Sequence, residues 1–126
     1  MKTLAAALAT LTACVLPAAA FGHHGVSTYR MDVTATLEGV VVKWDFGNPH
    51  TWLTLAVDGV HWEIEGAPPR WMSGQGFTPE SLAVGEAVGI TYHPHRSTPR
   101  AGILMEVRNA DGSVLKVNRP AALGGP

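Results

Sequence analysis

Residues 50–65 read His-Thr-Trp-Leu-Thr-Leu-Ala-Val-Asp-Gly-Val-His-Trp-Glu-Ile-Glu, and this stretch decides the fold. Two runs rich in β-branched and aromatic residues flank Asp58-Gly59, a dipeptide that strongly favours a two-residue β-hairpin turn. Successive side chains of a strand point to opposite faces, so Leu53 and Leu55 share one face while Trp52 lies on the other. The stretch therefore predicts an antiparallel hairpin with one apolar face.

Segments on both sides of this hairpin have the same β-strand character. The first is interrupted by Gly39, which indicates a bulge or a bend at a barrel corner. Between it and the hairpin, Asn48-Pro49 has the chemistry of a turn and leads directly into His50. The predicted strands are residues 33–44, 50–57, 60–65, 87–93, 103–108 and 114–117.

Residues 66–86 break the β pattern with prolines and glycines. Pro68 to Met72 predicts a short helix, and Thr78 to Leu82 predicts a single helical turn. About six short antiparallel strands with a small helical insertion indicate an all-β domain whose sheet curls upon itself. We expect a small, partly open β-barrel of the OB-like type, with a β-sandwich as the alternative.

The N-terminal residues 1–22 have the layout of a secretory signal peptide. Met1-Lys2 is a short positive region, residues 4–16 are apolar, and Pro17 to Ala20 provides small residues for cleavage. The apolar run is too short for an ordinary transmembrane helix, so we expect a periplasmic protein without a transmembrane segment after cleavage. Removing residues 1–22 from 126 leaves 104, which we divide into one domain at 23–118 and a flexible tail at 119–126.

The exact end of the signal peptide affects the chemistry of Phe21-Gly22-His23-His24-Gly25. Cleavage before Phe21 would start the mature chain Phe-Gly-His, while cleavage before His23 would place that histidine beside a free α-amino group. A third alternative is lipidation at Cys14, which follows Leu11-Thr12-Ala13 in a pattern read by lipoprotein signal peptidase. That alternative would anchor the protein to a lipid bilayer and leave the two histidines inside the chain.

Charge and cysteine content exclude several classes of function. The chain has 9 basic and 10 acidic residues, and a near-neutral balance offers no electrostatic footprint for nucleic acid. Its one cysteine, Cys14, lies inside the presumed signal peptide. The mature domain therefore has no disulfide, no thiolate metal ligand and no cysteine nucleophile.

The six histidines are the main source of chemistry, because imidazole nitrogens and a free amine suit Cu(II). His23 and His24 lie at the signal junction, and His50 follows a stiff turn. His93 and His95 flank Pro94 at a spacing that places both on one side of an extended chain. The simpler interpretation is that these side chains are solvated, as chain ends and loops usually are.

The order of motifs resembles DUF6152, a family of small exported bacterial proteins with a domain of unknown function. The resemblance rests on the His-His pair, the Leu37 to Val41 strand, residues 48–53 (Asn-Pro-His-Thr-Trp-Leu), residues 66–71 and residues 76–88. It implies one small periplasmic β domain and no established reaction. His23, His24 and His50 match motif positions of the family, whereas His93 and His95 fall in a loop that varies between its members.

These observations predict a periplasmic metal-binding protein that handles copper through His23, His24 and His50, with His93 and His95 as additional ligands. We expect metal handling in preference to catalysis. One alternative is a module without metal that binds a small ligand or a periplasmic protein partner, using Trp52 and the 68–76 insertion. A weaker alternative is a copper redox enzyme with an N-terminal histidine brace.

Overall fold

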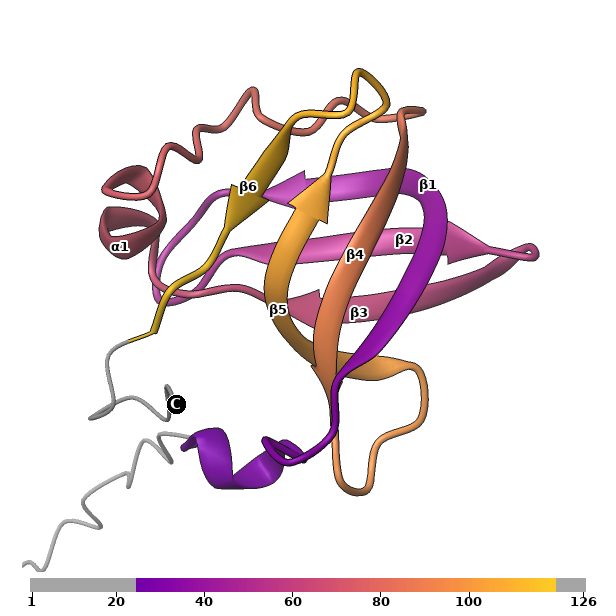
Figure 1. Ribbon diagram of the computed structural model, residues 1–126, viewed down its shortest axis with the longest axis vertical. Helices are drawn as coiled ribbons and strands as arrows, with labels where there is room; N and C mark the ends of the chain where they lie inside the picture. The colour runs from indigo at the N-terminus through magenta and orange to yellow at the C-terminus, as the bar shows by residue number, and fades with distance from the viewer. Residues whose placement is uncertain (1–24, 120–126) are drawn as a thin grey trace, which may run out of the picture.

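The computed structural model describes residues 25–119. It contains the predicted β-hairpin (Figure 1). Strand β2 (Trp52–Val57) is joined to β3 (Val60–Glu65) by Asp58 and Gly59. Both turn residues have positive φ, 50° and 77°, as a type I′ turn requires. The pairing runs from Val57 opposite Val60 to Trp52 opposite Glu65, and it confirms the predicted hairpin.

The other elements follow the predicted order, with ends that differ by a few residues. They are η1 (Val26–Thr28), β1 (Ala35–Asp45), α1 (Pro69–Ser73), β4 (Ala87–Pro94), β5 (Ala101–Arg108) and β6 (Val114–Lys116). The segment from Thr78 to Leu82 forms the predicted single turn, in which the Ser81 amide donates to the Thr78 carbonyl at 3.1 Å and the Thr78 hydroxyl accepts from the Glu80 amide at 3.2 Å. None of the helices in residues 25–119 is long and apolar enough to cross a membrane.

The strands form the all-β, OB-like barrel that the sequence predicts. The sheet order is β3-β2-β1-β4-β5-β6, and a parallel pairing of β3 with β5 closes five strands into a barrel, with β6 outside. The barrel is closed where the sequence predicted a partly open one, because β5 begins at Ala101, two residues before the expected start. Gly102 also allows the close approach of β5 to β4, since a Cβ atom there would collide with the Tyr92 ring and lie only 2.7 Å from the His93 carbonyl oxygen.

The barrel interior is filled by the alternate residues that the strand pattern predicts to face inward. Phe77, from the segment after α1, adds a fully buried ring at one end of this core. The other fully buried apolar side chains are Leu53, Leu55, Ile64, Met72, Leu104, Val41 and Val107. Trp44 and Trp62 pack against this core, whereas Trp52 is 39% exposed.

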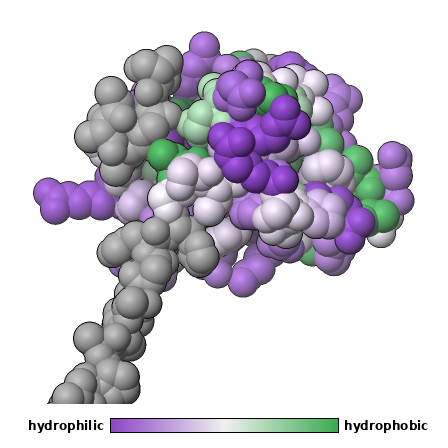
Figure 2. Space-filling view, turned by 90° about the horizontal axis from the view of Figure 1, so that it is seen from below, coloured by the Kyte–Doolittle hydropathy of each residue, from purple (hydrophilic) through white to green (hydrophobic). Residues whose placement is uncertain are grey.

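The segment before β1 lies along the outside of the barrel, beside the end of β4 and the β4–β5 loop (Figure 1, lower part). Tyr29 forms a β-bridge with His95. The Arg30 amide donates to the Pro94 carbonyl at 2.8 Å, and the Arg96 amide donates to the Thr28 carbonyl at 2.9 Å. Seen from this end, the molecule has a mostly hydrophilic face with smaller hydrophobic areas (Figure 2).

Candidate functional site

Glu65 is the centre of a polar cluster on the outer surface of the barrel. It is the last residue of β3 and lies on the face opposite to the buried Ile64, yet it is only 7% exposed. Tyr29, from the segment before β1, donates its hydroxyl hydrogen to Glu65 Oε2. His50, from the β1–β2 loop, places Nδ1 2.5 Å from Glu65 Oε1. The two carboxylate oxygens are therefore held by two segments that are distant in sequence.

The backbone at His50 is fixed by the residue that follows it. Thr51 is fully buried, and its hydroxyl donates to the Ala67 carbonyl at 3.0 Å. The Thr51 amide donates to the same carbonyl at 3.1 Å, and the Gly66 amide donates to the Thr51 carbonyl at 2.8 Å. Asn48-Pro49 is a cis peptide bond. His50 thus projects from a loop tied to the chain just beyond β3.

The contact with Glu65 determines which ring nitrogen of His50 is available for chemistry. An ionised carboxylate only accepts hydrogen bonds, so Nδ1 carries the hydrogen and Nε2 of the neutral ring keeps its lone pair. The His50 side chain is 35% exposed, while Glu65 behind it is nearly buried. This is the arrangement of many metal-bound histidines, whose second nitrogen donates to a carboxylate. It is equally the arrangement of a histidine base oriented by a carboxylate.

Burial controls the electrostatics of the groups around Glu65. Burial first, then the hydrogen bond to Glu65 and the charge of that carboxylate, raise the pKa of Tyr29 above the ordinary range of a phenol, so Tyr29 remains a donor. Burial also lowers the pKa of Arg119 to about 10, against the opposing effect of Glu65, which leaves the guanidinium charged at neutral pH. Arg119 Nη1 donates to the Leu104 carbonyl at 2.6 Å. The first residue of the predicted tail is therefore held against the barrel.

His95 lies next to the cluster but has a different hydrogen-bonding state. Its ring meets Tyr29 edge-on, with ring centroids 5.3 Å apart. Its Nδ1 accepts hydrogen bonds from the amides of Ser97 at 3.2 Å and Thr98 at 2.9 Å. A neutral ring in this state carries its hydrogen on Nε2, so metal binding by His95 would require these amide contacts to change.

His93 makes separate contacts. It is 7% exposed, and its Nδ1 lies 2.6 Å from the Val33 carbonyl oxygen. A carbonyl only accepts, so Nδ1 is the donor and Nε2 keeps the lone pair. His61 is exposed on β3. Within residues 25–119, no group of three or more His, Cys, Asp or Glu side chains is arranged to hold a metal ion. His23 and His24 lie outside the described residues.

Sequence reasoning identified His50 and missed Glu65, Tyr29 and Arg119. Strand alternation places Glu65 on the face opposite to Ile64, where an exposed carboxylate is ordinary. One signal was available: the hairpin pairing puts Glu65 opposite Trp52. Because Trp52 follows His50 by two residues, this pairing places Glu65 near the β1–β2 loop that carries His50. Tyr29 and Arg119 carried no such signal, because their contacts with Glu65 of β3 and Leu104 of β5 join segments that are distant in sequence.

Two comparisons with known proteins bear on this cluster. A sequence model described as "Family of unknown function (DUF6152)" matches residues 11–106, well over half of the chain. The matched range contains Tyr29, His50 and Glu65 together with the other five histidines, and it ends before Arg119. No curated protein sequence matches the chain.

Proposed function

Because the chain belongs to DUF6152, a family of unknown function, its role has to be inferred from its own residues, and we propose that it is an exported, periplasmic copper-binding protein. His50 Nε2 would supply one ligand from the folded domain. His23, with either the new α-amino group or His24, would supply the others. The proposed activity is metal handling, without a catalytic step.

The observation that carries this proposal is the contact between His50 Nδ1 and Glu65 Oε1 at 2.5 Å. It fixes the ring orientation and leaves Nε2 as a neutral nitrogen donor at a half-exposed position. Imidazole nitrogen is a preferred ligand of Cu(II), and the mature domain contains no thiolate to compete for the metal. Glu65 then has the role of an orienting partner behind the ligand.

The path of the chain supports a contribution from the N-terminal histidines. Tyr29 binds the same carboxylate as His50, and Gly25 precedes it by four residues. The segment that follows His24 therefore packs at the same cluster as His50. Since no three His, Cys, Asp or Glu side chains within residues 25–119 are grouped to hold a metal ion, the proposed site takes its remaining donors from His23 together with either the α-amino group or His24.

Protons compete with metal for an imidazole lone pair, so we expect Cu(II) binding to weaken as solution pH falls through the range in which imidazoles are protonated. Isothermal titration of Cu(II) into the mature protein tests the ligand set. His50→Ala should weaken binding by more than about tenfold, the lower limit for losing even an outer-shell partner. The matched control is His61→Ala, which removes an exposed histidine of β3 and should leave the affinity unchanged.

The decisive variant combines His23→Ala with His50→Ala. Unchanged Cu(II) affinity in a folded double variant would refute the proposed site. A native mass spectrum of protein purified from periplasm would report both the first residue and any retained copper. A spectrum that stays metal-free after adding equimolar Cu(II) would also contradict the proposal.

A second candidate function is a small-ligand or protein-interaction module. It is favoured by the 39% exposure of Trp52, which pairs with Glu65 on the β2–β3 face that OB folds use to bind ligands. In that case added Cu(II) would leave thermal stability unchanged. The fluorescence of Trp52, compared between the wild type and Trp52→Phe, would instead report ligand binding.

A further inference from the structure

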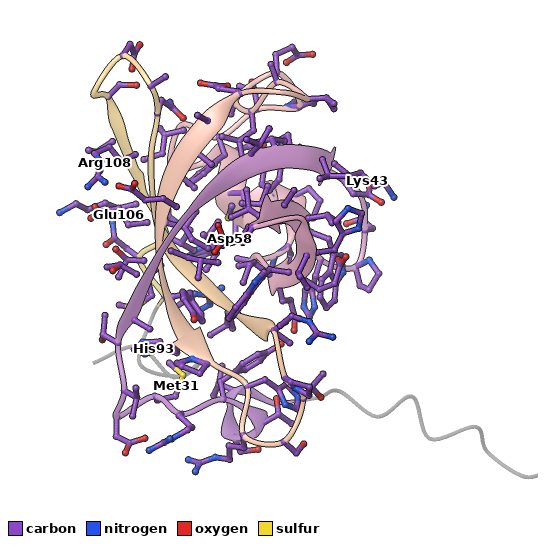
Figure 3. All side chains as sticks on the ribbon, turned by 90° about the vertical axis from the view of Figure 1, so that its right-hand side faces the viewer. Met31, Lys43, Asp58, His93, Glu106 and Arg108 are labelled. Atoms are coloured by element: carbon purple, nitrogen blue, oxygen red, sulfur yellow. The ribbon has the colours of Figure 1, made fainter. Side chains whose placement is uncertain are left out.

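A groove lies on the outer face of β1, β4 and β5, where Gly89 provides no side chain. It consists of two adjoining hollows of about 130 and 450 Å³, both lined by Glu38, Gly89 and Arg108. These residues are direct neighbours across the strands, since Gly89 pairs with Glu38 of β1 and with Arg108 of β5. Arg108 and Glu106 project from this side of the barrel (Figure 3). The groove contains no residue of the His50–Glu65 cluster.

Arg108 places a positive charge over the floor of this groove. A Cβ atom at Gly89 would lie 2.7 Å from Arg108 Nη2 and 3.3 Å from its Cζ, so the guanidinium occupies the space that a side chain would fill. Nη2 reaches across β4 and donates to Glu38 Oε1 at 3.2 Å. Within residues 25–119 this is the one hydrogen bond of the Arg108 side chain, whereas a guanidinium has five N–H donors. Arg108 therefore has donors to offer to an acceptor from outside the chain.

Glu38 is a partner that a ligand can displace. Its side chain is 83% exposed and that of Arg108 is 55% exposed. Ion pairs between exposed side chains contribute little stability, because water solvates both charges and the pairing restricts two long side chains. A carboxylate that arrives with its ligand can bind the guanidinium through two parallel hydrogen bonds. The neighbouring cation on this face, Lys116, lies 3.6 Å from its own partner, Glu106.

The larger hollow adds an apolar surface beside the guanidinium. Its lining includes Val40, which is 42% exposed, and the exposed side chains of Ala87 and Ala110. Its volume falls in the range of small-molecule sites. An apolar surface next to one cation suits a hydrocarbon chain that ends in an acid. We propose that the groove binds a small aliphatic carboxylate, with the acid group on Arg108 and the chain over Val40 and Ala87.

The alternative explanation is that Arg108 and Glu38 only form an ion pair on the surface of the sheet. The proposal differs from it because Glu38 then competes with the ligand for Arg108. Glu38→Gln removes the competing charge and should raise the affinity for the acid about two- to fivefold. Arg108→Gln removes the cation and should lower the affinity more than about tenfold. The two variants of one ion pair thus have opposite expected effects.

The test is a titration of sodium hexanoate into the metal-free, isotope-labelled mature protein, followed by the chemical shifts of the backbone amides. We expect saturable shifts at residues 87–89 and 108–110. Hexanoate should bind at least about tenfold more tightly than acetate, because each buried methylene adds to the affinity. The matched control is Lys116→Gln, which removes the neighbouring cation on the same face and should leave the affinity unchanged. Since no copper is present, the result is independent of the site proposed at His50.

Three results would overturn this inference. The first is the absence of saturable shifts around the groove, and the second is an unchanged affinity in a folded Arg108→Gln variant. The third is a Glu38→Gln variant that binds hexanoate no more tightly than the wild type. Amide spectra of the variants without ligand show whether each one is folded. Equal affinities for acetate and hexanoate would contradict the role assigned to Val40 and Ala87.

Discussion

Replacing Glu65 with glutamine should both destabilise the domain and weaken the metal ligand that we propose at His50. Glu65 accepts from Tyr29 and from His50 while nearly buried. A hydrogen bond to a charged acceptor contributes about 1.5–3 kcal/mol, against about 1 kcal/mol for a neutral one, so two weakened bonds cost about 2 kcal/mol. For a domain of this size that corresponds to a fall in melting temperature of about 8–16 °C.

The same substitution changes the chemistry of the imidazole. Glutamine has one acceptor oxygen and one NH2 group, so either Tyr29 or His50 must face the NH2 group in place of an acceptor oxygen. If the NH2 group faces His50, the ring moves its hydrogen to Nε2 and loses the lone pair that the proposed metal site requires. We therefore expect Cu(II) affinity to fall by about 10- to 100-fold, as for other outer-shell carboxylates.

Glu63→Gln is the matched control for this experiment. Glu63 lies two residues away on the same face of β3, is exposed, and accepts a hydrogen bond from Thr54 at 3.1 Å. Its substitution should change stability by no more than about 0.5 kcal/mol. Urea unfolding followed by circular dichroism measures both variants. Equal stabilities of the two variants, within about 0.5 kcal/mol, would show that Glu65 has no special role.

Two further predictions concern the elements around this cluster. Tyr29→Phe leaves a buried Glu65 oxygen without its donor and should cost about 1–3 kcal/mol at neutral pH. The raised pKa of Tyr29 means that the folded state holds the phenol proton more tightly than the unfolded state, so the stabilisation by Tyr29 is complete below about pH 10 and is lost as pH rises further. In urea unfolding, Tyr29→Phe should therefore lose less stability than the wild type as pH rises through the alkaline range. An identical dependence of stability on pH in the two proteins would contradict the assignment. Gly102→Ala places a Cβ against the Tyr92 ring and 2.7 Å from the His93 carbonyl, so it should disturb the packing of β5 on β4 and destabilise the domain by about 1–3 kcal/mol, whereas Gly74→Ala, with its nearest neighbour at 3.4 Å, should be tolerated. Equal unfolding midpoints for the two glycine variants would show that the close approach of β4 and β5 does not require Gly102.

The strands and the hairpin could be predicted because their signals are local. Asp58-Gly59 needs only its own backbone preferences to form the turn, and the alternation from Leu53 to Leu55 needs only the period of a strand. Closure of the barrel depends instead on contacts across the chain. Ala101 and Gly102 carry weak strand propensity, and they join β5 because Glu63 and Ile64 present an edge to pair with.

The candidate site was only partly predictable for the same reason. His50 could be identified because Pro49 and the strand that follows place it at a defined position. Glu65 has no unusual neighbours in the sequence, and its burial is created by Tyr29, which lies 36 residues earlier in the chain. The predicted roles of His23 and His24 concern residues outside the described part and stay predictions.

The contacts around Glu65 also restrict what can bind there. An OB-like barrel usually offers the β2–β3 face as a groove for an extended polymer. Here Tyr29, from the segment before β1, and Arg119, from the segment after β6, lie near Glu65 at one end of that face. Near Glu65, the side chain of His50 is 35% exposed and Trp52 is 39% exposed. A partly exposed imidazole and an exposed indole at one end of this face suit a small ligand better than a strand of nucleic acid, which agrees with the near-neutral charge of the chain.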